Sequence, residues 1–389
     1  MAQQILVIGA GIAGLATAVA LQRRGLDVTV IEERTNTSSG AGISIWPNAL
    51  AALDEIGLGD AVRDAGGRVT AGALRWRDGT WLRRPSPQRL EKALGEPLVV
   101  IRRSRLTTIL ADALAGGTLH NGLAVRELVT TGDGVRVMLS DATTREASAV
   151  VGADGTRSVV ARHLNGTLTD RYVGYTAWRG VADCAIDPDV AGEAVGPGIE
   201  FGHVPLGPDH TYWFATERAP EGRTAPHGEL NYLKDKFASW AEPIPTVLAT
   251  TDPADVLRND LYDRDQARQW SRGPVVVVGD AAHPMRPHLG QGGCQGLEDA
   301  AILASFIERA DDLVTAFSRF ATFRRPRVRS LVRESVMIGR IVNLRPAFLS
   351  GLASRATVLG PEALLNRHLA AVASRAAFVM PTDRDMAPA

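Results

Sequence analysis

Three glycines near the start of the chain have the spacing of a phosphate-binding turn. Gly9, Gly11 and Gly14 follow the apolar run 5–8, which is typical of a strand buried on both faces. In such a turn the first glycine permits a tight bend, the second lets a pyrophosphate approach the backbone, and the third lets the next helix pack closely. The free N–H groups and positive dipole end of that helix favour an anion. The spacing therefore predicts a dinucleotide site.

An acidic residue follows this turn at the distance that ribose binding requires. Residues 15–24 have the apolar spacing of a helix, and Gly25 is placed to end it. Residues 28–32 form the next expected strand, and Glu32 at its end can accept hydrogen bonds from ribose hydroxyls. We do not expect a signal peptide, because the stretch has no basic start and its centre is rich in glycine. The motif does not identify which dinucleotide binds.

A second glycine-rich turn lies far downstream. The apolar run 274–278 ends in Gly279-Asp280, and Gly290, Gly292 and Gly293 precede a helix that we expect from Leu297. Backbone N–H groups at this turn can bind an anion or a carbonyl oxygen. The sequence thus offers two separate groups of backbone donors.

Two charged features between these turns have two explanations each. Asp154 ends a third buried-strand run, and its carboxylate can either cap the next helix or serve a cofactor. Arg102, Arg103 and Arg105 begin a helix expected to run toward Leu114, where positive charge opposes the helix dipole. A bound anion or a solvated helix end would each account for them.

The composition limits the class of protein. The chain has 389 residues with 43 basic and 43 acidic side chains, a balance that argues against nucleic acid or an anionic membrane as the main partner. Cys184 and Cys294 are the only cysteines, so we expect no disulfide framework and a cytoplasmic location. No apolar run is long enough to span a bilayer. His283 and His288 have no third ligand at metal-binding spacing, so we expect no metal site.

The remaining chain contains elements that could position these residues. Asp78-Gly79 predicts a hairpin between residues 74–77 and 80–82, and strands 123–129 and 135–139 flank another turn. Residues 171–270 are rich in aromatic residues, proline and glycine. The strand-like runs in this segment, 199–204 and 211–215, favour a mainly antiparallel sheet that could cover a substrate cavity. Residues 300–380 have a helical pattern with expected breaks near Pro326, Pro346 and Gly360-Pro361.

In combination, the motifs resemble the single-component FAD-dependent aromatic hydroxylases, the para-hydroxybenzoate hydroxylase-like flavoprotein monooxygenases. The resemblance runs from the N-terminus to about Arg327 and rests on residues 9–25, Asp154-Gly155, Gly279-Asp280 with His283-Pro284, and 290–299. Residues 40–48 and 292–294 look most similar to urate hydroxylase-like and zeaxanthin epoxidase-like members.

This resemblance implies FAD as the cofactor. Gly9, Gly11 and Gly14 would hold its pyrophosphate, Glu32 its adenosine ribose and Asp280 its ribityl hydroxyls. The N–H groups of the second turn would stabilise negative charge on the reduced flavin. The cofactor-binding set that the resemblance implies is Gly9, Gly11, Ile12, Ala13, Gly14, Glu32, Glu33, Arg34, Gly42, Ile43, Arg103, Val125, Asp154, Asp280, Pro287, Gly290, Gly292 and Gly293.

The resemblance also implies a reaction. NADH or NADPH would reduce FAD, O₂ would add to form a flavin hydroperoxide, and a hydroxyl group would pass to a small aromatic or other electron-rich substrate. No second G-x-G-x-x-G turn is present, so NAD(P)H is expected to bind transiently. Tyr212, Arg179 and His203 are the residues expected to face the substrate, with a packed or surface position as the alternative for each.

The expected fold is α/β. A Rossmann-like FAD-binding domain would comprise residues 1–70, 97–165 and 272–327, and an inserted antiparallel-sheet substrate domain would comprise residues 71–96 and 166–271. Residues 328–389 would form C-terminal helices, and the chain would be a monomer or a homodimer. An antibiotic-modifying hydroxylase, a flavin-dependent dehydrogenase or oxidase, and a non-catalytic flavin-binding sensor share the same cofactor motifs and stay open.

Overall fold

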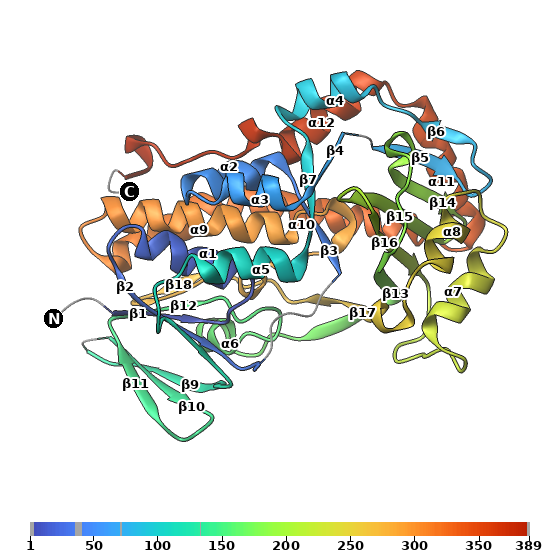
Figure 1. Cartoon of the computed structure of the whole chain (residues 1–389). Coiled ribbons are helices and arrows are strands. Elements are labelled where there is room, and N and C mark those ends of the chain that lie inside the picture. Colours follow the sequence, from blue (N-terminus) through green and yellow to red (C-terminus); the bar gives the residue numbers. More distant parts are fainter. Residues whose placement is uncertain (1–3, 36–40, 71, 133, 387–389) are drawn as a thin grey trace.

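Two large sheets form the centres of two lobes in the structure, which is a computed structural model (Figure 1). It describes residues 4–35, 41–70, 72–132 and 134–386. Residues 36–40, which hold part of the stretch that resembles urate hydroxylase-like proteins, lie outside the described residues. Among the described helices, none has both the length and the hydropathy to cross a membrane.

The first lobe contains a six-stranded sheet of order β18-β19-β12-β1-β2-β8, parallel except for β18. Its strands are β1 Gln4–Ile8, β2 Asp27–Glu32, β8 Leu119–Asn121, β12 Ala149–Gly152, β18 Ser271–Arg272 and β19 Val275–Val277. The three central strands β1, β12 and β19 are buried on both faces, which explains their continuous apolar runs. The expected strands at both glycine-rich turns are confirmed.

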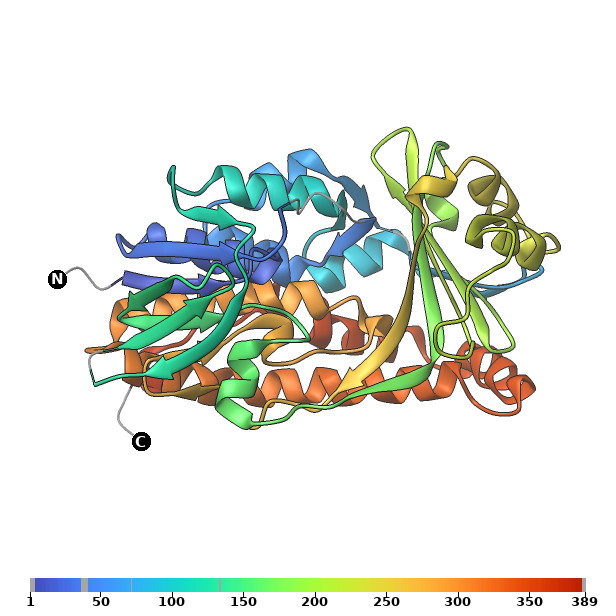
Figure 2. The ribbon, with the colours of Figure 1, turned by 90° about the horizontal axis from the view of Figure 1, so that it is seen from below.

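Helices and a small sheet cover the two faces of this parallel sheet (Figure 1). On one face lie α1 Ile12–Gln22, α5 Arg103–Asp112 and α9 Gly292–Arg309. On the other lie α6 Val159–Asn165 and a three-stranded sheet of β9 Val125–Thr130, β10 Val135–Leu139 and β11 Thr144–Ala147 (Figure 2). This double cover is the α/β architecture that the sequence predicts.

The second lobe is built on a seven-stranded sheet of order β17-β13-β16-β15-β14-β5-β6. Its strands are β5 Ala73–Trp76, β6 Trp81–Arg83, β13 Asp170–Ala182, β14 Gly192–Gly196, β15 Ile199–Leu206, β16 His210–Glu217 and β17 Leu257–Arg264. All neighbours are antiparallel except β14 and β5, so the expected, mainly antiparallel sheet is confirmed. The hairpin at Asp78-Gly79 is the β5–β6 turn, where Gly79 has φ +90°.

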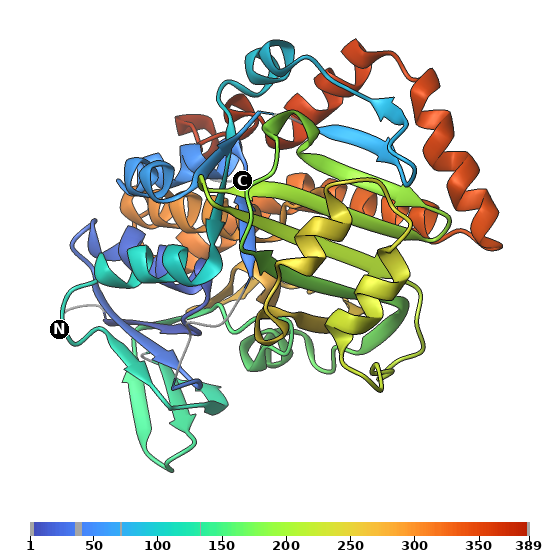
Figure 3. The same ribbon diagram turned by 45° about the vertical axis from the view of Figure 1, so that its right-hand side comes forward.

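One face of the seven-stranded sheet is covered by two helices, and the other faces the first lobe. Helices α7 Glu229–Phe237 and α8 Ile244–Ala249 lie across the outer face (Figure 3). The inner face packs against a small sheet of β3 Gly42–Ile45, β4 Gly67–Val69 and β7 Leu98–Arg102. Because β3 and β7 lead directly into the first lobe, this inner face lies where the two lobes meet.

The remaining helices are α2 Pro47–Glu55, α3 Gly59–Ala65, α4 Pro87–Leu94, α10 Leu313–Val342, α11 Ala347–Ala356 and α12 Glu362–Ala373. Two expectations need correction. The downstream helix α9 begins at Gly292 and not at Leu297, so both glycines are helical. Pro326 does not break a helix but lies inside α10, which runs past it for four more turns. The breaks at Pro346 and Gly360-Pro361 are confirmed.

Candidate functional site

The first glycine turn has an open side that can accept a ligand. A Cβ at Gly9, where φ is +101°, would lie 2.5 Å from the Ala153 carbonyl oxygen. A Cβ at Gly14 would lie 1.9 Å from the Gly9 carbonyl oxygen, so helix and turn are in close contact. A Cβ at Gly11 would meet no protein atom within 4 Å. The turn is thus closed behind and open at its middle glycine, as a pyrophosphate site requires.

The Glu32 carboxylate is fixed beside this turn. Its Oε2 accepts a hydrogen bond from the Ala10 N–H at 2.7 Å, and its Oε1 accepts one from the Arg34 N–H at 2.9 Å. Glu32 is buried, whereas Glu33 and Arg34 are exposed next to it. The Leu123 N–H donates to the Glu32 carbonyl oxygen at 2.9 Å, which places the segment entering Val125 alongside. These residues lie together at one edge of the parallel sheet.

Asp154 acts as a cap on α6. Its Oδ2 accepts hydrogen bonds from the Val159 N–H at 2.7 Å and the Val160 N–H at 3.3 Å, and its Oδ1 accepts one from the Ser158 hydroxyl. Burial raises the pKa of Asp154, and these hydrogen bonds oppose that shift. The cap is the first of the two roles that its sequence position allows. A role toward a cofactor stays a prediction.

The second glycine turn lies opposite the first. A Cβ at Gly293 would lie 2.9 Å from Ile43 Cδ1 and 3.9 Å from Ile12 Cδ1, so the starts of α9, β3 and α1 converge. A Cβ at Gly292 would lie 4.0 Å from Asp280 Oδ1, and Asp280 itself is exposed. Pro287 and Gly290 lie in the connection between them. Free N–H groups of α9 and an exposed carboxylate therefore meet beside Gly11 and Ile12.

Arg103 points toward this convergence. Solvent reaches part of the side chain, yet the surrounding protein lowers the pKa of Arg103 by desolvation, while the nearby charge of Asp280 raises it. The Arg103 N–H also donates to the Ala41 carbonyl oxygen at 3.0 Å, which ties α5 to the start of β3. Of the two explanations for the arginines at this helix start, this position favours a neighbouring anion.

The inner face of the seven-stranded sheet brings Tyr212 and Arg179 to the same place. In the strand register, Val181 lies opposite Tyr212, and Arg179 lies opposite Phe214. A Cβ at Gly42 would lie 2.5 Å from the Tyr212 ring, so this ring covers β3. Burial raises the pKa of Tyr212, whereas the nearby charges of Arg179 and Arg103 lower it.

His203 does not lie with them. It is buried on the outer face of the sheet, in contact with the Phe201 ring at a centroid distance of 6.2 Å, and beside Arg75 Nη2 at 3.4 Å. The expectation that His203 faces the substrate therefore needs correction, because strand alternation directs Val204 inward and His203 outward. His203 is instead a packed side chain, which is the alternative given for it above.

Several polar residues on the inner face were not predicted. Glu200 is buried and accepts a hydrogen bond from the Thr216 hydroxyl at 2.7 Å. His288 lies 3.7 Å from Glu200 and within 2.7 Å of the Tyr175 hydroxyl. An acidic residue in an otherwise apolar strand was the available signal, since charged side chains are rarely buried without a role or a partner. The described residues contain no cluster that could hold a metal ion.

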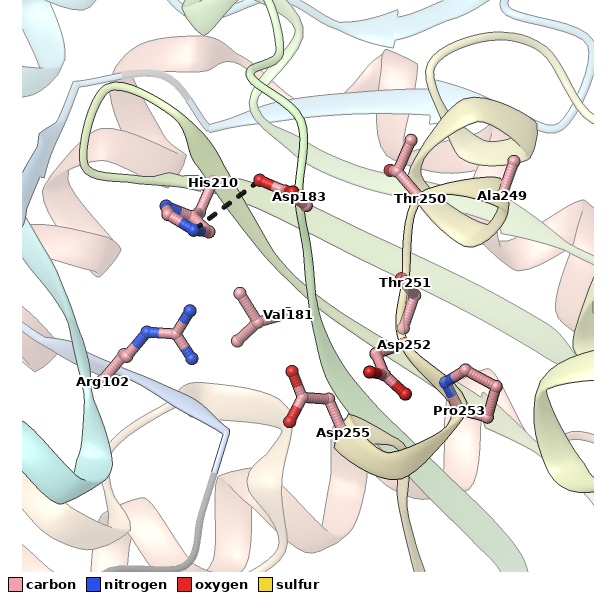
Figure 4. Close-up of a pocket in the computed structure, with 10 residues that line it drawn as sticks. All are labelled: Arg102, Val181, Asp183, His210, Ala249, Thr250, Thr251, Asp252, Pro253 and Asp255. Atoms are coloured by element: carbon pink, nitrogen blue, oxygen red, sulfur yellow. Dashed lines mark ion pairs between the residues drawn. The ribbon is translucent and has the colours of Figure 1, made fainter.

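A separate open recess of about 490 Å³ lies at the edge of the sheet (Figure 4). Three carboxylates and His210 line it together with Arg102, and the His210 Nε2 lies 3.8 Å from Asp183 Oδ1. None of the predicted site residues lines this recess. Its acidic lining would repel the phosphates of a dinucleotide, so the glycine turns are the better candidate for cofactor binding.

Comparisons with known proteins agree with this geometry. A family model described as FAD binding domain matches residues 2–312. Aurachin C monooxygenase/isomerase from Stigmatella aurantiaca is 37% identical over 88% of this chain and 91% of its own length. An FAD-dependent urate hydroxylase from Mycolicibacterium vanbaalenii is 32% identical over 85% and 86%.

Among solved structures, Klebsiella pneumoniae HpxO complexed with FAD and uric acid has a TM-score of 0.89 and 27% identity, covering 95% of this chain and 96% of that one. The two-lobed fold of this chain thus matches that of a solved protein that binds FAD. This chain belongs to the FAD-binding domain family, and its relatives are flavoprotein monooxygenases.

Proposed function

We propose that this chain is an FAD-dependent monooxygenase that uses NADH or NADPH and O₂ to hydroxylate a small aromatic or other electron-rich substrate. The observation that carries the proposal is the open Gly11 turn facing the start of α9, next to an inner sheet face that bears Tyr212 and Arg179. When bound, FAD supplies the redox chemistry, because it accepts hydride from NAD(P)H and activates O₂.

The residues at the two turns fit FAD in physical terms. Gly9, Gly11 and Gly14 leave the pyrophosphate room at the start of α1, and the fixed Glu32 carboxylate is available to the adenosine ribose. The exposed Asp280 carboxylate can accept hydrogen bonds from ribityl hydroxyls, and the first N–H groups of α9 can stabilise charge on the flavin ring. The rest of the predicted cofactor set would line the same path.

The inner sheet face would position the substrate and exclude water. Tyr212 is buried against Gly42, and its apolar neighbours Val181 and Leu206 close the side nearest β7. A water-excluded site protects the activated oxygen from unproductive decay and strengthens each polar contact to the substrate. Arg179 and Tyr212 are the groups that we propose to orient the aromatic ring.

The test is oxygen transfer by the purified, FAD-loaded protein. We expect an aromatic panel to contain compounds that stimulate NAD(P)H oxidation and acquire one ¹⁸O atom from ¹⁸O₂. Substrate oxidation without label would identify a dehydrogenase or oxidase. Flavin binding with no turnover of any panel member would favour a sensor, and either result would reject the monooxygenase proposal.

A further inference from the structure

Two acidic side chains lie together on the inner face of the seven-stranded sheet. In the β14–β15 register, Glu193 is opposite Gly202, and Glu200 is opposite Val195. Residues 193 and 195 point to one face of the sheet, as do residues 200 and 202, so the two glutamates are diagonal neighbours. Because Gly202 has no side chain, the ring of Phe214 lies over the position opposite Glu193.

A row of residues that lie opposite one another on neighbouring strands connects this pair to Arg179. Reading across the strands, Glu193 lies opposite Gly202, Gly202 opposite Phe214, and Phe214 opposite Arg179. A Cβ at Gly202 would lie 2.2 Å from the Phe214 ring, so an aromatic surface covers the middle of the row. Three strand spacings separate the two ends, roughly 14 Å. A ring stacked near Phe214 would therefore have the glutamates at one end and Arg179 at the other.

Glu200 connects the sheet to the second glycine turn. It accepts a hydrogen bond from the Thr216 hydroxyl at 2.7 Å, and its Oε1 lies 3.7 Å from Nδ1 of His288, which precedes Gly290 in the connection from Asp280 to α9. The Tyr175 hydroxyl lies 2.7 Å from Nε2 of the same imidazole. Glu200 is thus held in place by the protein on the side nearest the proposed flavin.

The carboxyl group of Glu193, the second glutamate, can accept further hydrogen bonds. Within the part of the chain that the structure describes, no hydrogen bond stabilises the Glu193 carboxylate, and burial together with the charge of Glu200 raises its pKa to about 8. Burial and the charge of Arg286 lower the pKa of His288 to about 4, so the imidazole brings no positive charge to the pair. Glu193 is half-buried, so part of its carboxyl group is open to a ligand that could supply a hydrogen-bond partner.

We infer that Glu193 and Glu200 form a substrate anchor that hydrogen-bonds an N–H or O–H group of an uncharged aromatic compound and disfavours aromatic carboxylates. The inference rests on the proposed function only in taking the inner sheet face as the substrate site. Because the charge of Glu200 helps to raise the pKa of Glu193 to about 8, Glu200 is the ionised member near neutral pH, and the pair carries one negative charge. That charge repels a third carboxylate, whereas the carboxyl oxygens accept hydrogen bonds from neutral donors. The site would thus select its substrate in two ways, by repelling aromatic carboxylates and by accepting a hydrogen bond from a neutral N–H or O–H group.

Matched amides and acids test this preference directly. Two isosteric pairs serve as probes: 2-hydroxybenzamide with 2-hydroxybenzoate, and indole-3-carboxamide with indole-3-carboxylate. Binding is measured as the change in flavin absorbance when the oxidised, FAD-loaded protein is titrated. We expect the amide of a pair to bind at least tenfold more tightly than the acid, since a hydrogen bond to a charged group is worth about that factor.

Variants separate the anchor from a merely structural role. Glu200→Gln should reduce the amide-to-acid preference about tenfold, because it removes the negative charge of the pair. Glu193→Lys should reverse the preference, because a cation would then bind the acid. Glu127→Gln, at an exposed position of β9, should leave the preference unchanged. Flavin content and far-ultraviolet circular dichroism check that each variant is folded.

Equal binding of both members of every pair, including no binding of either, would overturn the inference. An unchanged preference in Glu200→Gln and Glu193→Lys would also overturn it. These titrations need neither NAD(P)H nor O₂, so they stand apart from the monooxygenase test. Label from ¹⁸O₂ in the acids of these pairs but in neither amide would contradict the anchor while supporting the proposed function.

Discussion

Asp280 is the residue on which FAD retention should depend most directly. Its carboxylate is exposed at the end of β19 and lies beside Gly292, close enough for its charge to act on Arg103. We expect Asp280→Asn to weaken FAD binding by about 10- to 100-fold, because a charge-assisted hydrogen bond to the ribityl chain would be lost. Fluorescence titration of the apoprotein with FAD measures this effect. Full flavin retention would remove Asp280 from the proposed cofactor set.

At the residue scale, the sequence was sufficient where the function depends on neighbouring residues along the chain. Gly9, Gly11 and Glu32 lie within one strand-turn-helix-strand unit, so their spacing alone indicated a common site. His203 and Glu200 depend instead on which face of β15 is turned inward. That choice is made by register and packing with other strands, and a one-residue change would exchange the two faces. The sequence of β15 alone therefore cannot specify which of its faces is turned inward, because that depends on the strands with which it pairs.

At the element scale, two glycines of the first turn should respond differently to the same change. A Cβ at Gly14 would lie 1.9 Å from a backbone oxygen, so Gly14→Ala should lower the free energy of unfolding by several kcal/mol, at or above the roughly 1–3 kcal/mol typical of overpacking. A Cβ at Gly11 meets no protein atom, and its backbone, with φ −71°, accepts alanine. Gly11→Ala should cost less than about 1 kcal/mol but weaken FAD binding at least tenfold.

Urea denaturation of the apoproteins and titration with FAD separate the two effects. Each variant is the control for the other, because both add one methyl group within one turn. Equal losses of stability, or unchanged FAD affinity in Gly11→Ala, would contradict the assignment of the open side of the turn.

A buried ionic network joins α9 to α10 and should set the acid stability. Asp299 accepts hydrogen bonds from the Gly279 N–H and Arg324 Nε, both at 2.8 Å, and lies 2.6 Å from His283 Nε2. Burial alone would raise the pKa of Asp299, but the charges of His283 and Arg324 and the hydrogen bonds lower it to about 2. The unfolded value is about 3.9. Asp299 therefore stabilises the fold above about pH 4, and this contribution is lost as the pH falls toward 2.

The expected contribution is roughly 2–3 kcal/mol at neutral pH, from the difference of about 1.9 between these pKa values at about 1.36 kcal/mol per unit. Asp299→Asn should lower stability at pH 6 and flatten the decline between pH 4 and 2, as measured by urea denaturation across this range. Asp27→Asn, at an exposed position of β2, is the matched control. A decline in Asp299→Asn as steep as in the unaltered chain would show that the carboxylate does not determine the transition.

This network also explains why Pro326 does not break the helix, contrary to the sequence pattern. An internal proline removes a hydrogen bond and costs about 3 kcal/mol. In α10, however, Arg324 binds Glu298 and Asp299, and Phe320 and Val328 are fully buried on the same helix. These tertiary contacts outweigh a local preference that a sequence pattern reports by itself.

At the scale of the whole molecule, the proposed site depends on how the two lobes meet. Strands β13 and β17 run between the lobes (Figure 2). The Tyr212 ring of the second lobe packs on β3, which pairs with β7. The general α/β plan was predictable because buried strands and glycine turns are local signals. The contact between Gly42 and Tyr212 was not predictable, because these two residues are far apart in sequence.

Gly42 permits this close approach of the lobes, so Gly42→Ala should impair coupling before it impairs folding. The added Cβ would lie 2.5 Å from the Tyr212 ring and push the inner sheet face away from β3. Water would then enter the proposed site, and more reduced oxygen would leave as hydrogen peroxide. We expect Gly42→Ala to retain FAD while the fraction of NAD(P)H oxidation that yields product falls at least twofold. Gly116→Ala, where a Cβ meets no atom within 4 Å, should keep the original ratio. If Gly42→Ala keeps it too, contact between the lobes does not control water access to the site.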